Sequence, residues 1–117
     1  MLTKQQITAF RARLEEEAAS LRSRLDDTGQ QLAQPEQLQE GGQDSTDEAS
    51  LLYDREMRIA ELRQVQDRLA LIERALNRIE EGTYGVSEVS GKPIPLERLE
   101  VLPWATTLTD EPAPVIG

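Results

Sequence analysis

Carboxylates are the most chemically active side chains of this sequence, and they gather near its middle. Residues 36–56 include seven acidic residues and one basic residue, which gives this stretch a net charge of −6. Within it, Asp44 and Asp47 lie three positions apart, a pair that can bind a divalent cation weakly. Two carboxylates without further fixed ligands do not make a catalytic centre. We therefore expect the stretch to act through its charge on a basic or metal-bearing partner.

The sequence lacks the side chains that most enzymes and metal sites need. It contains no Cys and no His, which excludes disulfides, thiolate ligands and the commonest general base at neutral pH. Its formal net charge of −9 would repel phosphate backbones, so we expect no direct sequence-specific binding to DNA. These features predict a protein that is not an enzyme and that holds no cofactor or metal.

The elements that carry the acidic stretch are two long helices. A first helix is predicted from about residue 4 to residue 33, because Thr3 and Gln6 form a capping box and Leu2 and Ile7 have the spacing of a hydrophobic staple. A second is predicted from about residue 45 to residue 81, with Gly82 as its end. Both show apolar residues at helical spacing. These are Ile7, Phe10, Leu14, Ala18, Leu21, Leu25 and Leu32 in the first, and Leu62, Val65, Leu69, Ile72, Leu76 and Ile79 in the second.

Facing residues of an antiparallel pair have position numbers with a nearly constant sum. Pairs such as Leu14 with Leu69 and Leu21 with Leu62 give 83, and Leu32 with Leu51 gives the same value. Leu25 with Ile59 gives 84. This register places the midpoint of a hairpin in the polar segment that contains Gly41-Gly42, and a slip of one turn stays open.

The sequence after residue 82 changes to short turns around a possible strand pair. Pro95 is predicted in the first turn of a short helix that ends before Pro103, and Trp104 is predicted to be a core residue. Arginines of the second helix are expected to be solvated partners of nearby acids; they are Arg55, Arg58, Arg63, Arg68, Arg74 and Arg78. No stretch approaches the ~20 apolar residues of a membrane span, so we expect a cytoplasmic protein without a membrane contact.

Two stretches resemble the DksA/TraR family. Gly82-Thr83-Tyr84-Gly85, followed by Gly91, Ile94, Arg98-Leu99-Glu100 and Pro103, is similar to the family's C-terminal zinc finger, and Asp44 to Ala49 is similar to its Asp-x-x-Asp-x-Ala tip motif. The implied fold is mainly α. Its parts are a long antiparallel helical hairpin (coiled coil) at residues 1–82 with an acidic tip at about 34–49, a small degenerate zinc-finger-like domain at 83–111, and an irregular tail at 112–117.

The resemblance departs from the family at the finger. Ser87, Ser90, Leu108 and Glu111 stand where the family has four cysteines. Neutral serines bind zinc poorly and a leucine cannot bind it, so apolar packing must replace the contribution of a metal to folding. We expect a finger-shaped domain without metal.

The resemblance implies a stress-related transcription regulator that binds bacterial RNA polymerase through its secondary channel, with the hairpin tip approaching the catalytic centre. Asp44 and Asp47 would be polar contacts and Ala49 a small residue that permits close approach. A simpler interpretation is that Asp47 caps the second helix, Asp44 keeps the loop solvated and Ala49 favours helix. Two other functions stay open: a coiled-coil scaffolding protein without polymerase contact, and a factor that stimulates cleavage by the polymerase.

Dependence on the alarmone ppGpp is doubtful. Longer members of the family respond to it with the help of an N-terminal segment that this sequence lacks.

Overall fold

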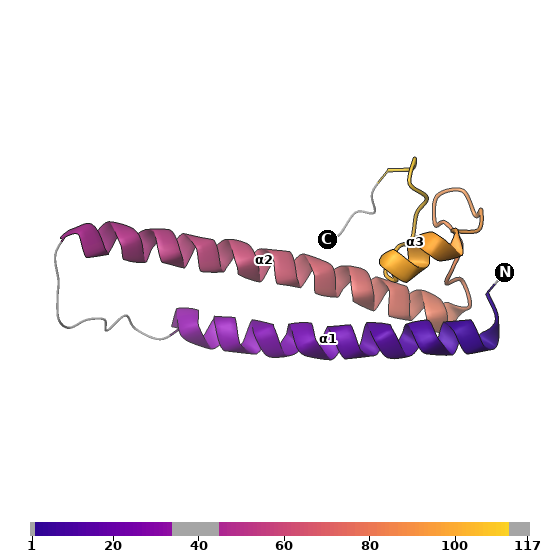
Figure 1. Ribbon diagram of the computed structural model, residues 1–117, viewed down its shortest axis with the longest axis horizontal. Helices are drawn as coiled ribbons and strands as arrows, with labels where there is room; N and C mark the ends of the chain where they lie inside the picture. Colours follow the sequence, from indigo (N-terminus) through magenta and orange to yellow (C-terminus); the bar gives the residue numbers. More distant parts are fainter. Residues whose placement is uncertain (1, 34–44, 113–117) are drawn as a thin grey trace.

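The chain forms a long helical hairpin with a small C-terminal segment folded over one end. The computed structural model describes residues 2–33 and 45–112, with helices α1 (Lys4–Ala33), α2 (Ser45–Glu81) and α3 (Leu96–Val101). Helices α1 and α2 lie side by side in opposite directions and α3 covers their base (Figure 1), within an extent of 61 × 27 × 22 Å. The predicted mainly α hairpin fold is confirmed. None of the described helices is both long and apolar enough to cross a membrane.

Local chemistry sets the ends of the hairpin's helices at its base. The backbone N–H of Thr3 donates to Gln6 Oε1 at 2.9 Å, and that of Gln6 donates to Thr3 Oγ1 at 3.0 Å, which is the predicted capping box. At the C-terminus of α2, Gly82 has a φ of +80°, and the N–H of Thr83 donates to the carbonyl of Arg78 at 2.8 Å. This is a Schellman-type end, which glycine adopts without a steric penalty.

The predicted pairing of the two helices holds at the base but not toward the tip. Three ion pairs cross between the helices: Arg11–Glu80, Arg22–Glu73 and Arg24–Glu61. Leu14, Leu21 and Leu69 are buried as expected, whereas Leu51 and Ile59, which the predicted register buries, are 49% and 41% exposed. Heptad spacing on both helices leaves shifted pairings nearly equivalent, so the exact register stays a prediction.

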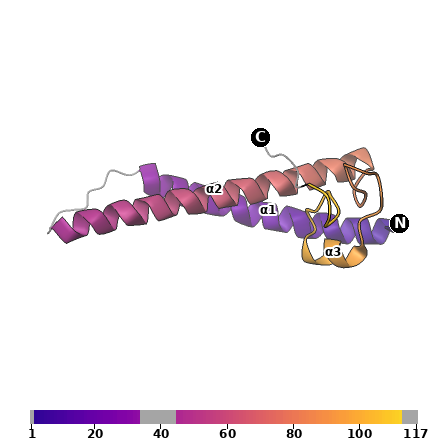
Figure 2. The ribbon, with the colours of Figure 1, turned by 90° about the horizontal axis from the view of Figure 1, so that it is seen from above.

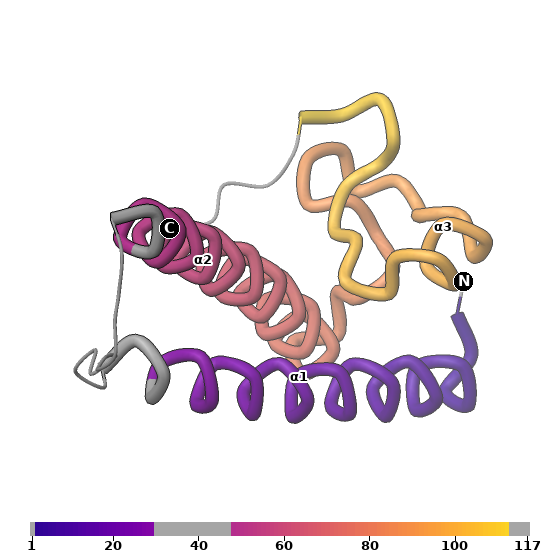
Figure 3. Tube along the Cα trace, turned by 60° about the vertical axis from the view of Figure 1, so that its left-hand side comes forward, coloured from indigo at the N-terminus to yellow at the C-terminus, as the bar shows by residue number. Residues whose placement is uncertain are grey.

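Helix α2 extends beyond the last residue of α1 (Figure 1), and the two helices separate with distance from the C-terminal segment (Figure 3). We call residues 48–61 of α2, which are all exposed, the projecting segment; its last turn lies beside α1, where Glu61 pairs with Arg24. Its large apolar side chains include Leu52, Tyr53 and Met57. Seen from above, the two helices cross at a shallow angle (Figure 2), and their buried residues lie in the parts of the helices nearer the C-terminal segment.

One apolar cluster joins the base of the hairpin to the C-terminal segment, which we define as residues 83–112. Its buried members are Phe10, Leu14, Ala18 and Leu21 of α1, Val65, Leu69, Ile72, Ala75 and Ile79 of α2, and Tyr84, Ile94, Leu99 and Ala105 beyond them. The rings of Phe10 and Tyr84 lie 5.9 Å apart between centroids. Because the core is shared, the division of the chain at residue 82 into separate domains stays a prediction.

The C-terminal segment contains one β-bridge, between Val86 and Pro93, where a strand pair was considered. The N–H of Ser87 donates to the carbonyl of Lys92 and that of Ile94 to the carbonyl of Gly85, both at 2.8 Å. Pro93 has no N–H to extend this ladder, so the pairing stays short. Pro95 is the N-cap of α3, one position outside the turn in which it was predicted.

Candidate functional site

The predicted tip motif lies at the free end of the rod. Helix α2 begins at Ser45, so Asp47 belongs to its first turn, and Ala49 is exposed on the same helix. Asp44 and the side chain of Asp47 lie outside the described residues. The structure therefore places Asp47 and Ala49 on one helix end, while the roles of Asp44, Asp47 and Ala49 stay predictions.

Acidic side chains continue from the tip along the projecting segment. Glu48, Asp54, Glu56 and Glu61 are all exposed, and Arg55 and Arg58 are the basic residues among them. Carboxylates on a narrow, solvated helix are accessible to a basic partner from several sides. Such a charge distribution steers association with a positively charged surface.

The four positions that resemble zinc ligands come together around one carboxylate, and we call Ser87, Ser90, Leu108 and Glu111 the Glu111 cluster. The Ser87 hydroxyl donates to Glu111 Oε1, and the backbone N–H of Leu108 donates to the same oxygen at 2.7 Å. Ser90 lies in the same turn, where its backbone N–H donates to the Ser87 hydroxyl oxygen at 3.2 Å. The Leu108 side chain takes no part, because it packs against the apolar core.

These hydrogen bonds favour the charged form of Glu111. The Leu108 N–H, followed by the hydroxyls of Ser87 and Ser90, lowers the pKa of Glu111 below its ordinary value of 4.5. A carboxylate that accepts the Ser87 hydroxyl and the Leu108 N–H, with a second neutral hydroxyl and a hydrocarbon side chain in the same cluster, does not fit the cysteine and histidine ligands that structural zinc requires. Within residues 2–33 and 45–112, no group of three or more acidic side chains is placed to hold a metal ion.

Arginines of α2 hold the C-terminal segment against the hairpin. Arg74 forms a two-point ion pair with Glu88, with Nε donating to Oε2 at 3.0 Å and Nη2 to Oε1. The hydrogen bonds from Arg74 lower the pKa of Glu88. Arg78 Nη2 donates to the carbonyls of Thr83 at 3.0 Å and Val86 at 2.9 Å. Arg74 is exposed and pairs with an acid, as expected, whereas Arg78 binds backbone carbonyls of the segment that follows its own helix.

Two aromatic residues of the C-terminal segment complete this attachment. The guanidinium of Arg68 lies over the ring of Trp104, 4.3 Å from its centroid, so Trp104 is half-buried beneath a cation. The buried Tyr84 hydroxyl donates to the carbonyl of Pro103 at 2.8 Å. Sequence reasoning missed the contact between Arg68 and Trp104, although an arginine row on one helix followed by a lone tryptophan was visible in the sequence.

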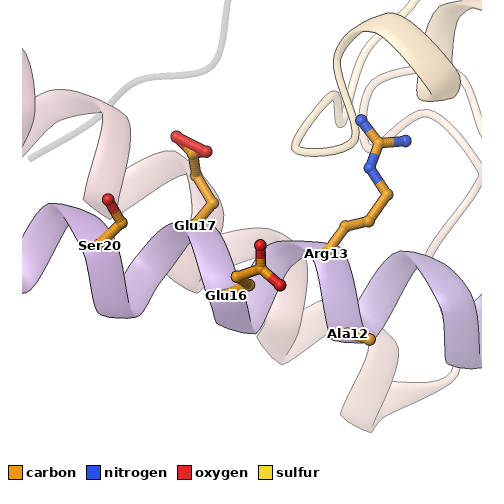
Figure 4. A pocket seen from close by; sticks show the side chains of 5 residues that line it. All are labelled: Ala12, Arg13, Glu16, Glu17 and Ser20. Atoms are coloured by element: carbon orange, nitrogen blue, oxygen red, sulfur yellow. The ribbon is translucent and has the colours of Figure 1, made fainter.

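A depression on the described part of the hairpin is lined by side chains of α1 alone. The depression in Figure 4 has a volume of about 350 Å³ and lies along one face of α1. Its lining residues are Ala12, Arg13, Glu16, Glu17 and Ser20. Arg13 points toward the C-terminal segment, where its Nη2 donates to the carbonyl of Glu100 at 3.1 Å. This arginine is therefore already engaged in holding the base together.

Comparison with known sequences relates the chain to transcription factors. No family model matches it. YteA of Bacillus subtilis, an uncharacterised protein, is 41% identical over 94% of this chain and 49% of its own length. The RNA polymerase-binding transcription factor DksA of Caulobacter vibrioides is 40% identical over 54% of this chain and 44% of its own length. The chain spans about half the length of these curated relatives or less.

Solved structures share the hairpin fold. The transcription factor DksA2 of Pseudomonas aeruginosa superimposes with a TM-score of 0.76 and 30% identity, over 90% of this chain and 78% of that one. The RNA polymerase binding protein and transcriptional regulator Dks of Chlamydia trachomatis gives a TM-score of 0.53 and 28% identity, over 93% and 85%. With the fold and the sequence similarity in agreement, the chain belongs to the DksA/TraR family.

Proposed function

We propose that the protein regulates transcription by binding bacterial RNA polymerase through the secondary channel, with the hairpin tip directed toward the catalytic centre. The observation that carries the proposal is the projection of α2 beyond α1 at the end of a rod 61 Å long. A narrow helical end, distant from a broader base, suits insertion into a channel. Family membership supports the same partner, because named relatives bind RNA polymerase.

In this proposal the base and the tip have different tasks. The C-terminal segment and the adjoining part of the hairpin provide a broad docking surface, whereas Asp44, Asp47 and Ala49 act at the narrow end. A carboxylate placed against a basic group in a partly desolvated channel contributes far more than it does in water. In this proposal the contact forms in the step that changes the open complex and not in docking, so the ~2–5 kcal/mol that loss of one partner of such a pair costs falls on activity and not on competition for the channel.

The proposal is tested by a pull-down of purified bacterial RNA polymerase, with competition by another secondary-channel factor. We expect a complex that the competitor displaces. Asp47→Asn should compete nearly as well as the wild type but fail to change the lifetime of open complexes at a sensitive promoter. Asp54→Asn, which removes an exposed carboxylate two turns along the same helix, is the matched control and should act as the wild type does. A pull-down without polymerase, or an Asp47→Asn variant with full activity, would contradict the proposal.

One observation favours a second candidate, a coiled-coil protein that binds another helix. Leu52 and Tyr53 are each 61% exposed on the projecting segment, and Met57 is 52% exposed. Apolar side chains of this size on one helix are typical of helix-binding surfaces. Sedimentation equilibrium separates the candidates: self-association without polymerase binding would favour the coiled-coil function.

A further inference from the structure

We propose that the Glu111 carboxylate performs in this chain the task of a structural metal, tying residues 107–111 to the turn at residues 87–91. The two segments are far apart in sequence. Hydrogen-bond donors from both converge on this one side chain. The inference concerns the stability of the C-terminal segment and does not depend on the polymerase partner.

The hydrogen-bonding capacity of Ser87 makes Glu111 the required acceptor. A serine hydroxyl has two acceptor lone pairs and one donor hydrogen. Ser87 Oγ accepts the backbone N–H of Val89 at 3.0 Å and that of Ser90 at 3.2 Å, so both acceptor positions are used. Its hydrogen is then available only to Glu111. Because Ser87 is 2% exposed, loss of this acceptor would leave a buried hydroxyl hydrogen unpaired, which is unfavourable.

The cluster also connects to α2. Ser87 immediately precedes Glu88, whose carboxylate is held by Arg74 and whose N–H donates to the carbonyl of Thr106 at 2.8 Å. The chain from Thr106 leads directly into Leu108 and Glu111. Glu111 therefore completes a continuous set of hydrogen bonds that joins α2, the turn at residues 87–91 and the segment at residues 105–111.

These hydrogen bonds take the place of a metal site, and the cluster is not a vacant site for a metal ion. Glu111 Oε1 already accepts hydrogen bonds from both segments, and the Leu108 side chain packs against the core. Zinc would have to displace these donors while gaining only one good ligand. The cluster provides the cross-link that four thiolates and a cation would otherwise provide.

Amide hydrogen exchange on the full chain tests the proposal, with Glu111→Ala compared with Asp110→Ala. Asp110 is an exposed neighbour of the same charge, so its removal controls for the change in net charge. We expect Glu111→Ala to lower protection of the Leu108 and Val89 amides by about tenfold, as loss of hydrogen bonds to a charged group predicts. Asp110→Ala should leave both amides as in the wild type. The amides around Ile72 report whether the hairpin of each variant is folded.

A second measurement addresses the metal. Zinc added to the wild type, or a chelator, should leave its thermal midpoint unchanged, and Glu111→Gln should lose less protection than Glu111→Ala because the amide oxygen still accepts the Leu108 N–H. Equal protection in Glu111→Ala and Asp110→Ala would overturn the proposal. So would one equivalent of bound zinc that raises the midpoint of the wild type.

Discussion

Truncation of a leucine at two positions of the hairpin should have very different effects, because the register buries one and exposes the other. Leu14 is 0% exposed in the shared apolar cluster, whereas Leu52 is 61% exposed on the projecting segment. Leu14→Ala removes three carbons from a dry site, which costs ~2.4 kcal/mol in transfer free energy at ~0.8 kcal/mol per carbon. A cavity of a few tens of Å³ adds ~1 kcal/mol at ~24 cal/mol per Å³.

Leu52→Ala should cost under ~1 kcal/mol, because most of the side chain already contacts water and no cavity forms. Chemical denaturation followed by circular dichroism at 222 nm gives both free energies of unfolding. For Leu14→Ala we expect a thermal midpoint lower by roughly 10–15 °C in a chain of this size. Equal effects of the two substitutions, or a larger effect of Leu52→Ala, would show that the burial described for these two positions is incorrect.

The other predictions concern the C-terminal segment. Tyr84→Phe should lower the free energy of unfolding by ~1–2 kcal/mol, because the buried carbonyl of Pro103 loses its donor; an unchanged free energy would exclude that hydrogen bond. The pKa values of Glu88 and Glu111 are lowered in the fold, so their contribution is present above about pH 4.5 and is lost as pH falls through the folded-state values. Unfolding free energies between pH 3 and 6 should fall with acidification, and less steeply in Glu111→Gln. The purified protein should contain no stoichiometric zinc by elemental analysis.

The helix boundaries were predictable because they depend on neighbouring residues. The capping box of Thr3 and Gln6 and the end at Gly82 involve groups within five positions of one another, so local spacing was enough to place them. The register was not predictable in the same way. It depends on which of several similar heptad alignments lets the base pack around Tyr84 and Leu99, and those residues lie outside both seams.

The candidate site was likewise predictable from the sequence only in part. The spacing of Ser87, Ser90, Leu108 and Glu111 predicted their proximity through the family resemblance, and they do meet. Two details could be seen only in the folded loop. Glu111 accepts hydrogen bonds from Ser87 and Leu108, and Leu108 contributes only its backbone to the cluster. The ion pair of Arg74 with Glu88 likewise exists only because the chain reverses after α2 and returns along it.

The shared core holds the hairpin at its base, so a small rotation there becomes a large displacement at the far end. With 37 residues, α2 is ~55 Å long, so a rotation of about 5° at its base displaces its far end by about 5 Å. Side chains near Tyr84 and Trp104 therefore govern where the opposite end points, although they lie far from it. A substitution that weakens packing at the base would widen the range of directions that the tip adopts, while leaving every tip residue unchanged.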